Sequence, residues 1–350
     1  MEAQVKTGGV PTLSQLWENS RLFVTDEFLQ PPVILRVEDS IIGTLGNFSA
    51  STGKAKSKKT FNVCAIVAAA LRNSLILNYS ASLPQGKRRI LYADTEQSKF
   101  HCQRVLRRIL QLSQLPTGSQ PDTLEFLSLR RYSPKTRLGI IEEAIYHSEG
   151  LGLVIIDGVR DLAYDINSPA EATELITKLT QWTEERQVHI HTVLHLNKGD
   201  DNTRGHLGTE LNNKAETVLQ ITKDELDRNI SSVTSSYIRD IDFDPFAFRI
   251  NSNGLPELLD DYQPKQSVSQ KGFDYREVPE AKHREALAIL FSEAEQVSYS
   301  SLIGKLQKSY ALAGFSFGTN KAKLLKVFLE NKRMILKEDK CYRFNPDFHY

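Results

Sequence analysis

The octapeptide Gly53-Lys-Ala-Lys-Ser-Lys-Lys-Thr60 decides the fold, because it lies between a β-type run at 47–52 and an apolar helix-type run at 61–71. A phosphate-binding loop occupies this place in a fold, since backbone amides and the positive end of the helix dipole attract anions there. Its usual pattern is G-x-x-x-x-G-K-[ST], in which the lysine binds the β- and γ-phosphates and the hydroxyl binds magnesium. The placement predicts a nucleotide-binding protein.

Aligning Gly53 with the first glycine of that pattern makes Lys59 the phosphate lysine and Thr60 the magnesium ligand. The residues of the loop between them are Lys54, Ala55, Lys56, Ser57 and Lys58. The competing register pairs Gly53 with Lys54, and it fails because Ala55 has no hydroxyl and Phe48 stands at the first glycine. A lysine-rich surface turn that binds nothing is the alternative for this stretch taken alone.

Lys58 departs from the pattern, because it stands where the second glycine is usual. Glycine serves there when the backbone takes a positive φ or approaches the phosphate closely, and a side chain in that conformation costs roughly 1 kcal/mol. This cost is tolerable, and a lysine adds positive charge near the phosphates.

Two later runs are typical of buried parallel strands that end in carboxylates. Arg89-Ile-Leu-Tyr-Ala-Asp-Thr-Glu96 makes Glu96 a candidate general base for an attacking water. Leu151-Gly-Leu-Val-Ile-Ile-Asp157-Gly has the pattern of a Walker B strand, whose terminal Asp157 orients water on magnesium. An ordinary buried strand followed by an Asp-Gly turn is the alternative for the second run.

A third strand is expected at 188–198, and His195 near its end is placed to sense the γ-phosphate. His189 and His191 lie within this strand and are expected to pack or to face solvent. Helical spacing of apolar residues predicts helices at 98–115 and 169–186, the second with Ser168 as N-cap, Pro169 at the first helical position and Glu171 completing a capping box. This alternation predicts an α/β fold with a doubly wound, mainly parallel sheet.

The order of these motifs resembles the RepA-like ATPases of the RecA/DnaB superfamily. The motifs that carry the resemblance are the octapeptide at 53–60, Tyr92-Ala-Asp-Thr-Glu96, Val154-Ile-Ile-Asp157-Gly-Val-Arg-Asp161, His195-Leu-Asn-Lys198 and Arg204-Gly-His-Leu-Gly-Thr209. More narrowly, the chain is similar to RepA-like ATPases on mobile elements of Bacteroidota, in which a lysine or arginine also replaces the second P-loop glycine. The resemblance covers roughly residues 20–260.

The resemblance implies a RecA-like core that hydrolyses ATP with Mg²⁺, commonly as a ring of subunits that share their nucleotide sites. It implies that Lys59 and Thr60 hold phosphate and metal, that Asp157 serves the metal shell and Glu96 the water, and that His195 links the nucleotide to DNA-facing loops. Arg204 falls where such proteins carry a mobile DNA-binding loop, although this stretch also suits a plain strand–helix connection. Arg239 and Lys214 are the candidates for a finger that reaches a neighbour's site.

The C-terminal residues have the pattern of a winged helix. After a linker at 261–282, helices are expected at 284–294, 299–310 and 319–331, the last with Thr319 as N-cap, followed by a hairpin that turns at Glu338-Asp339. The domain scheme is an N-terminal arm at 1–40, a RecA-like core at 41–260, the linker, and a winged-helix domain at 283–350.

The expected winged-helix domain is basic, with eleven Lys and Arg against seven Asp and Glu, whereas the whole chain carries a net charge of +1. In this fold the third helix commonly enters the major groove and the wing touches the backbone. The candidate DNA contacts are Asn320, Lys321, Lys323, Lys326, Lys337, Lys340 and Arg343. The alternative is that these lysines form a solvated helix face on a module that binds protein.

Composition agrees with a core of about 220 residues and a smaller module, since 350 residues carry 40% hydrophobic and 25% charged side chains. Three cysteines without a CxxC pair favour a reduced cytoplasmic compartment and no zinc site. The N-terminus does not resemble a signal peptide, and the longest apolar run is too short to cross a membrane.

The sequence therefore predicts a cytoplasmic, Mg²⁺-dependent ATPase that acts on DNA as a homo-oligomer, in the sharper form a hexameric ring helicase that serves replication or mobilisation of a plasmid or transposon. The first alternative is an ATP-gated DNA-binding regulator with little hydrolysis, which Lys58 favours. The second is a RecA-like recombination or partner-loading ATPase that binds single strands without translocating.

Overall fold

The computed structural model describes residues 12–196, 205–225, 227–259, 262, 274–276, 278–292 and 294–348. They form two compact units, which divide at Tyr262 and Gln263 and are described separately below. No helix within these residues is long and apolar enough to span a bilayer. The predicted DNA contact Arg204 lies outside the described residues.

The first unit is built around a nine-stranded sheet with the order β13-β12-β11-β10-β3-β9-β8-β6-β7. The six strands from β10 to β7 are parallel, and β11, β12 and β13 extend the sheet antiparallel beyond β10. This confirms the predicted α/β class with a mainly parallel sheet. Its strands are β3 (Phe48–Gly53), β6 (Arg89–Asp94), β7 (Leu124–Ser128), β8 (Leu151–Asp157), β9 (His189–His195), β10 (Thr217–Lys223), β11 (Ile230–Ile238), β12 (Phe246–Ile250) and β13 (Pro256–Leu258).

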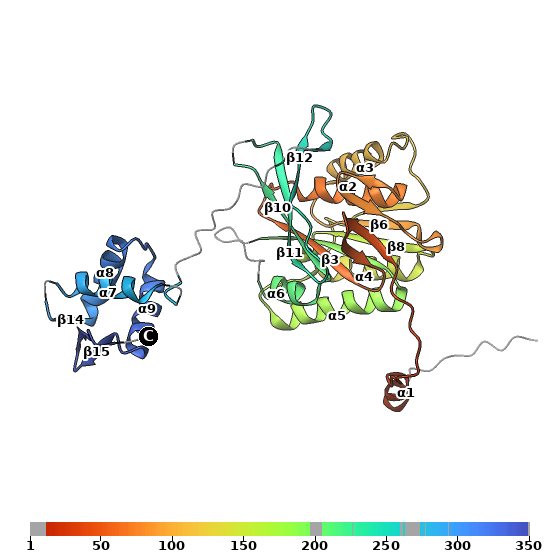
Figure 1. Cartoon of the computed structure of the whole chain (residues 1–350). Helices are drawn as coiled ribbons and strands as arrows, with labels where there is room; N and C mark the ends of the chain where they lie inside the picture. The colour runs from red at the N-terminus through yellow and green to blue at the C-terminus, as the bar shows by residue number, and fades with distance from the viewer. Residues whose placement is uncertain are drawn as a thin grey trace, which may run out of the picture. The chain divides into compact units, whose positions relative to one another are not determined.

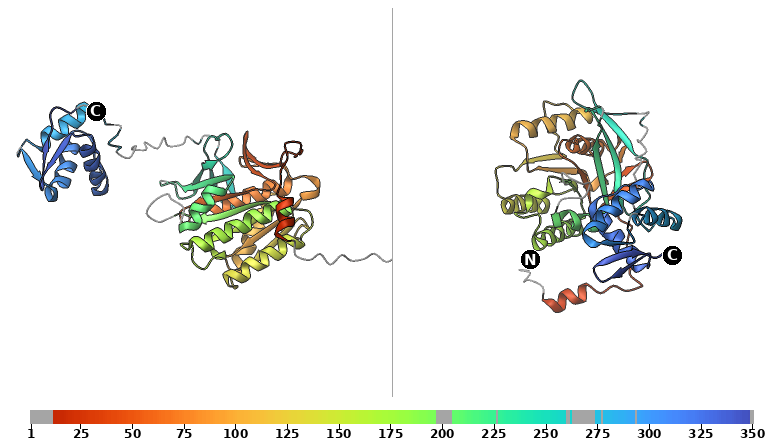
Figure 2. Two further views of the ribbon diagram at one scale, coloured as in Figure 1. Left: turned by 90° about the horizontal axis from the view of Figure 1, so that it is seen from below. Right: turned by 90° about the vertical axis from the view of Figure 1, so that its left-hand side faces the viewer.

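Helices cover both faces of this sheet (Figures 1 and 2). The α2 and α3 helices pack on one face in one hydrophobic cluster, and α4, α5 and α6 pack on the other in a second cluster. The P-loop strand β3 lies between β9 and β10, with the Walker B strand β8 beyond β9, so the ends of these strands meet at one edge. The helices are α2 (Lys59–Arg72), α3 (Lys99–Leu112), α4 (Pro134–His147), α5 (Pro169–Arg186) and α6 (Gly205–Lys214).

The α5 helix begins where the sequence predicts, but its capping box is only half formed. The Ser168 hydroxyl accepts a hydrogen bond from the amide of Glu171. The Glu171 carboxylate does not return to Ser168, because it accepts from the amides of Tyr164 and Asp165 instead. The side chain thus stabilises the preceding loop rather than the helix N-terminus.

A separate four-stranded antiparallel sheet has the order β2-β1-β5-β4, with two strands from before α2 in the sequence and two from after it. It comprises β1 (Val33–Val37), β2 (Ser40–Thr44), β4 (Leu75–Ile76) and β5 (Tyr79–Ala81). Residues 33–40, placed in the N-terminal arm by the sequence analysis, thus contribute to a sheet whose buried side chains join the α2 cluster. The α1 helix (Leu13–Asn19) buries none of its residues.

The described residues of the second unit form three helices and a three-stranded antiparallel sheet with the order β14-β16-β15. Its hydrophobic cluster includes Leu287, Leu306, Leu325 and Tyr342, which are almost fully buried. Three details differ from the sequence analysis. The α7 helix spans Glu280–Leu290 rather than 284–294, so it begins within the expected linker. Gly318 rather than Thr319 is the N-cap, and the hairpin turns after Glu338, which pairs with Cys341. The elements are α7 (Glu280–Leu290), β14 (Gln296–Ser298), α8 (Tyr299–Leu312), α9 (Thr319–Asn331), β15 (Ile335–Glu338) and β16 (Cys341–Phe344).

Gly152 in β8 is a position where a side chain should destabilise the first unit. A Cβ atom there would lie 2.0 Å from the carbonyl oxygen of Lys87 and 2.8 Å from a Leu83 methyl. Gly152→Ala is therefore expected to lower the free energy of unfolding by about 3 kcal/mol. Gly139→Ala is the control, because a Cβ atom at Gly139 on α4 would meet no atom within 4 Å. This substitution is expected to raise the free energy of unfolding by about 0.5–1 kcal/mol, since alanine favours a helix more than glycine does. Equal urea midpoints for the two variants would contradict this packing argument.

Candidate nucleotide-binding site

The P-loop connects the end of β3 at Gly53 to the start of α2 at Lys59. Lys58 precedes the helix in the left-handed conformation, with φ 67° and ψ 31°, and its carbonyl accepts the first helical hydrogen bonds. Lys56 is also left-handed, with φ 65°. A Cβ at Gly53 would lie 2.3 Å from the carbonyl oxygen of Ile221, so only glycine fits at the end of β3. The backbone thus has the turn geometry that this motif requires, with lysine in place of the second glycine.

The Lys59 ammonium is the buried centre of the loop. It donates hydrogen bonds to the carbonyl oxygens of Gly53 and Lys54, at 2.8 and 3.0 Å, and to Nδ1 of His195 at 3.0 Å. Burial lowers the pKa of Lys59 to about 8, against the opposing influence of Asp157 and Glu96. A phosphate next to this ammonium would favour its charged form.

Thr60 and Asp157 meet at the same edge of the sheet. The Thr60 hydroxyl donates to Oδ2 of Asp157 at 3.0 Å, and the buried Tyr92 hydroxyl donates to the same oxygen at 2.9 Å. Burial, and then the neighbouring Asp94, raise the pKa of Asp157 to about 6. A hydroxyl and a carboxylate in contact are oxygen donors of the kind that Mg²⁺ accepts.

Glu96 and His195 extend this arrangement into a connected chain. Lys59 can only donate, so Nδ1 of His195 accepts, and the ring proton on Nε2 is directed to Oε1 of Glu96 at 3.3 Å. The hydrogen bond from His195 lowers the pKa of Glu96, which is consequently ionised at neutral pH. The structure thus brings Lys59, His195 and Glu96 together, as the sequence analysis expected of a nucleotide site.

A cavity of about 340 Å³ opens above these residues. Its lining includes Lys56 to Phe61, Glu96, Asp157 and His195, together with three basic side chains of α3: His101, Arg104 and Arg108. The sequence analysis assigned these three residues no role. Their spacing of three and four residues was the available signal, because it places all three on one helix face.

The residues of this cavity fit a magnesium nucleotide. The Ser57 hydroxyl is buried in the loop without a hydrogen-bond partner among the described residues, so it is available to a ligand. The described residues hold no cluster of three or more His, Cys, Asp or Glu side chains suited to a metal ion. A cation at Thr60 and Asp157 would therefore complete its shell with phosphate oxygens and water, as Mg²⁺ does in phosphate-binding sites.

A buried hydrogen-bond chain runs beneath the P-loop between β3 and β9. His189 Nδ1 donates to the Thr44 carbonyl oxygen at 2.8 Å, so its Nε2 accepts from the Ser49 hydroxyl at 2.7 Å. That hydroxyl oxygen accepts from Nδ1 of His191 at 2.8 Å, and Nε2 of His191 accepts from Ser51. His189 and His191 are thus packed inside the sheet as neutral rings, and burial lowers the pKa of His189 and sets that of His191 at about 3.

Arg239 and Lys214 lie away from this cavity in their own chain. Arg239 donates through Nη2 to the carbonyl oxygen of Lys214 at 2.9 Å, and both side chains are exposed. Ile238, next to Arg239, pairs with Thr217 at the start of β10. Because β10 runs parallel to β3, this start lies at the sheet edge opposite to the P-loop.

The candidate DNA contacts of the second unit fall into two groups. Lys326 is ion-paired with Glu330 at 2.5 Å and lies over the rings of Tyr299 and Tyr342, and Arg343 is ion-paired with Glu338. The remaining candidates are exposed on α9 and on the β15–β16 hairpin: Asn320, Lys321, Lys323, Lys337 and Lys340.

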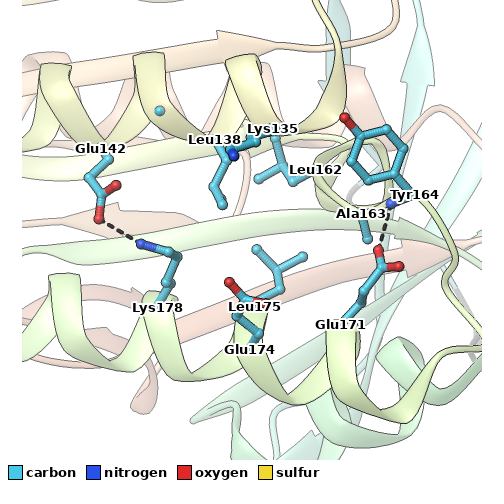
Figure 3. A pocket seen from close by; sticks show the side chains of 11 residues that line it. Lys135, Leu138, Glu142, Leu162, Ala163, Tyr164, Glu171, Glu174, Leu175 and Lys178 are labelled. Atoms are coloured by element: carbon cyan, nitrogen blue, oxygen red, sulfur yellow. Dashed lines mark hydrogen bonds and ion pairs between the residues drawn. The ribbon is translucent and has the colours of Figure 1, made fainter.

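Another cavity, of about 440 Å³, lies between α4 and α5 (Figure 3). Leu138, Leu162 and Leu175 line its apolar part. Its Lys178 ammonium is 2.8 Å from Glu142, and Glu171 accepts the Tyr164 amide, so these charged groups are already paired. The P-loop cavity is therefore the better candidate for an anionic ligand.

The chain is similar to a known protein family and to solved structures. A family model described as an AAA domain matches residues 19–201, which is more than half of the chain. Among solved structures, the crystal structure of the RadB recombinase is similar, with a TM-score of 0.42 and 13% sequence identity over 60% of this chain and 89% of that chain. No curated protein sequence matches the chain.

Proposed function

Since this chain belongs to the AAA domain family, we propose that it is a Mg²⁺-dependent ATPase that acts on DNA in the cytoplasm. The observation that carries the proposal is the connected group at the edge of the sheet, in which Lys59 reaches Glu96 through His195 while Thr60 contacts Asp157. These residues supply a cation for phosphate, a base for water and two oxygen donors for the metal, which are the parts that phosphoryl transfer to water requires.

The roles of the individual residues follow from these contacts. Lys59 and the amides of residues 54–60 would bind phosphate oxygens, and Thr60 and Asp157 would hold the magnesium ion. Bound Mg²⁺ would neutralise phosphate charge. Glu96 accepts a proton from an attacking water, and His195 keeps the Glu96 carboxylate oriented and ionised.

We further propose that the chain works as a RepA-like oligomer with a RecA-like core, in which a neighbouring subunit completes each site. Arg239 and Lys214 are exposed and lie at the sheet edge opposite to their own P-loop, so either suits a finger that acts in a neighbour. A ring helicase, in its hexameric form, is the sharper version, serving replication or mobilisation of a plasmid or transposon. Stable rings without DNA favour it, whereas DNA-templated filaments favour a recombination or loading ATPase.

The second unit is proposed to bind DNA as a winged helix. Its three helices and its β15–β16 hairpin suit a fold that places a helix in the major groove and a wing on the backbone. Lys321 and Lys323 on α9 and Lys337 and Lys340 on the hairpin are exposed cations for phosphate contacts. Arg204, which precedes α6 in the sequence, is proposed as a further contact.

Lys323→Ala is expected to weaken DNA binding several-fold and to reduce the salt dependence of binding by about one counterion, as loss of one phosphate contact predicts. The measurement is a titration of fluorescent duplex DNA at several salt concentrations. Lys308→Ala is the matched control, because Lys308 is exposed on α8, outside the proposed DNA-binding helix and wing. Equal losses for the two variants would argue against α9 as the DNA-facing helix.

The test of the proposed function is ATP hydrolysis with magnesium, with and without single-stranded DNA, by the wild type and Lys59→Ala. Turnover that rises with DNA and disappears in the variant is expected. Tight nucleotide binding without turnover would instead favour an ATP-gated DNA-binding regulator. That alternative has an observation in its favour, because the Lys58 ammonium is hydrogen-bonded to a neighbouring turn.

A further inference from the structure

Lys58 extends its side chain onto a turn of the antiparallel part of the sheet. Its ammonium donates to the carbonyl oxygen of Arg228 at 2.5 Å and lies 3.5 Å from that of Ile230 and 3.4 Å from the Ser231 hydroxyl. Residues 227–230 form this turn, which leads into β11 and is named the 227–230 turn below. One residue thus belongs to the P-loop by its backbone and holds a neighbouring turn by its side chain.

The 227–230 turn is a small unit with its own hydrogen bonds. The Asp227 amide donates to the Asp224 carboxylate, the Asn229 amide to the Asp227 carboxylate, and the Ile230 amide to the Asp227 carbonyl oxygen. The Lys58 ammonium joins these residues to the P-loop. A displacement of Lys58 therefore acts directly on the turn.

Arg108 makes a second connection of the same kind. Its guanidinium stacks on Phe61, in the first turn of α2, at 3.8 Å, and its Nε donates to the carbonyl oxygen of Gly254 at 3.2 Å. Gly254 lies in the turn between β12 and β13, residues 251–255, in which the Asn251 side chain accepts from the amides of Asn253 and Leu255. Both turns lie at the P-loop edge, because β10 and β12 run toward that edge (Figure 1).

We propose that Lys58 and Arg108 are positioning residues that couple nucleotide binding to the order of the 227–230 and 251–255 turns. A phosphate bound by the P-loop fixes the backbone of Lys58, and the same residue then restrains the 227–230 turn through its ammonium. A ligand against α3 and α2 fixes Arg108 and so restrains the 251–255 turn. Charge-assisted hydrogen bonds to carbonyl oxygens are strong enough for such coupling.

The inference rests on the proposed nucleotide site. It adds an ordering of the two turns on nucleotide binding, which a measurement of hydrolysis does not detect. The chain passes from β13 through residue 262 to the second unit, so the two turns lie in the segment that precedes it in sequence. A lysine at the usual glycine position therefore allows the P-loop to restrain the 227–230 turn, whereas a glycine has no side chain with which to do so.

The test is hydrogen–deuterium exchange of the full chain, with and without magnesium and a non-hydrolysable ATP analogue that saturates each variant. In the wild type, exchange of the amides in both turns is expected to slow by about tenfold on binding. Lys58→Gly should remove the response of the 227–230 turn and retain that of the 251–255 turn, whereas Arg108→Gln should do the reverse.

Two matched controls accompany these variants. Arg333→Gly removes the same charge from the same left-handed conformation, with φ 55°, at an exposed position of the second unit. Arg107→Gln changes the charge of α3 at an exposed position outside the cavity lining. Both controls should keep both responses.

A fluorescent ATP analogue first establishes binding, so that the two failures are distinct. No binding by the wild type overturns the proposed function and the inference with it. Binding without slower exchange in the turns overturns the inference alone. A full response of the 227–230 turn in Lys58→Gly, or its loss in Arg333→Gly, also shows that Lys58 does not carry the coupling.

Discussion

Glu96→Gln is expected to lower the rate of ATP hydrolysis by about 10²–10⁴-fold while nucleotide still binds, because a general base contributes this much and an amide cannot accept the proton. Glu96 is suited to the role, since the hydrogen bond from His195 lowers its pKa and about half of its side chain is exposed to the cavity. The measurement is steady-state turnover together with the affinity for a fluorescent ATP analogue. The phosphate-binding group Lys59 is unchanged in this variant.

Glu149→Gln is the matched control for this prediction, because it removes the same negative charge from a residue that is exposed in the turn after α4. It should hydrolyse ATP at the wild-type rate. Undiminished turnover in Glu96→Gln would assign the base to another residue. Loss of binding together with turnover would mean that Glu96 acts chiefly in assembling the site through His195 and Lys59.

Mild acid is expected to destabilise the first unit strongly, because His189 and His191 are neutral inside the folded sheet. Burial lowers the pKa of both rings, to about 3 for His191, from an ordinary value of 6.5. Below pH 6.5 the unfolded chain binds protons that the folded chain excludes, so stability is present above that value and is lost as pH falls toward 3. His191 alone should cost about 2–3 kcal/mol at pH 4.5.

The effect is large because whole domains are stable by only about 5–15 kcal/mol. The measurement is the free energy of unfolding in urea between pH 7.5 and 4.5. His191→Asn should reduce the slope against pH by about one proton, whatever its absolute stability. His147→Asn is the control, since His147 is exposed on α4, and it should keep the wild-type slope. A slope unchanged by His191→Asn would show that the ring is not held neutral.

Local sequence patterns predicted much of the core and of the site. The P-loop at Gly53–Thr60, the Walker B strand ending at Asp157 and the start of α5 at Pro169 depend on neighbours in sequence, and the structure places them where the patterns indicate. The contact of Thr60 with Asp157 follows from strands whose ends share one edge of the sheet. These features could be predicted because each combines a short sequence motif with a clear pattern of apolar residues.

Features that depend on pairing between distant segments were not predicted. The chain of His189, Ser49 and His191 requires β3 and β9 to be neighbours, which no local pattern reports. The four-stranded sheet depends on β1 and β5 meeting across α2. Glu171 was misassigned because its carboxylate accepts from the amides of Tyr164 and Asp165 instead. Thr319 was misassigned because it is the first residue of α9, one position after the N-cap Gly318, which makes no side-chain hydrogen bond.

The left-handed lysine before α2 has a consequence for how related chains can vary. A glycine at position 58 has no side chain and so requires no hydrogen-bond partner. The Lys58 ammonium requires acceptors within its reach, and the carbonyl oxygens of Arg228 and Ile230 supply them. In homologues, lysine or arginine at this position should therefore occur with a β10–β11 connection of constant length, and glycine with connections of many lengths. Position 58 and the β10–β11 connection, some 170 residues apart in sequence, are therefore expected to change together in evolution.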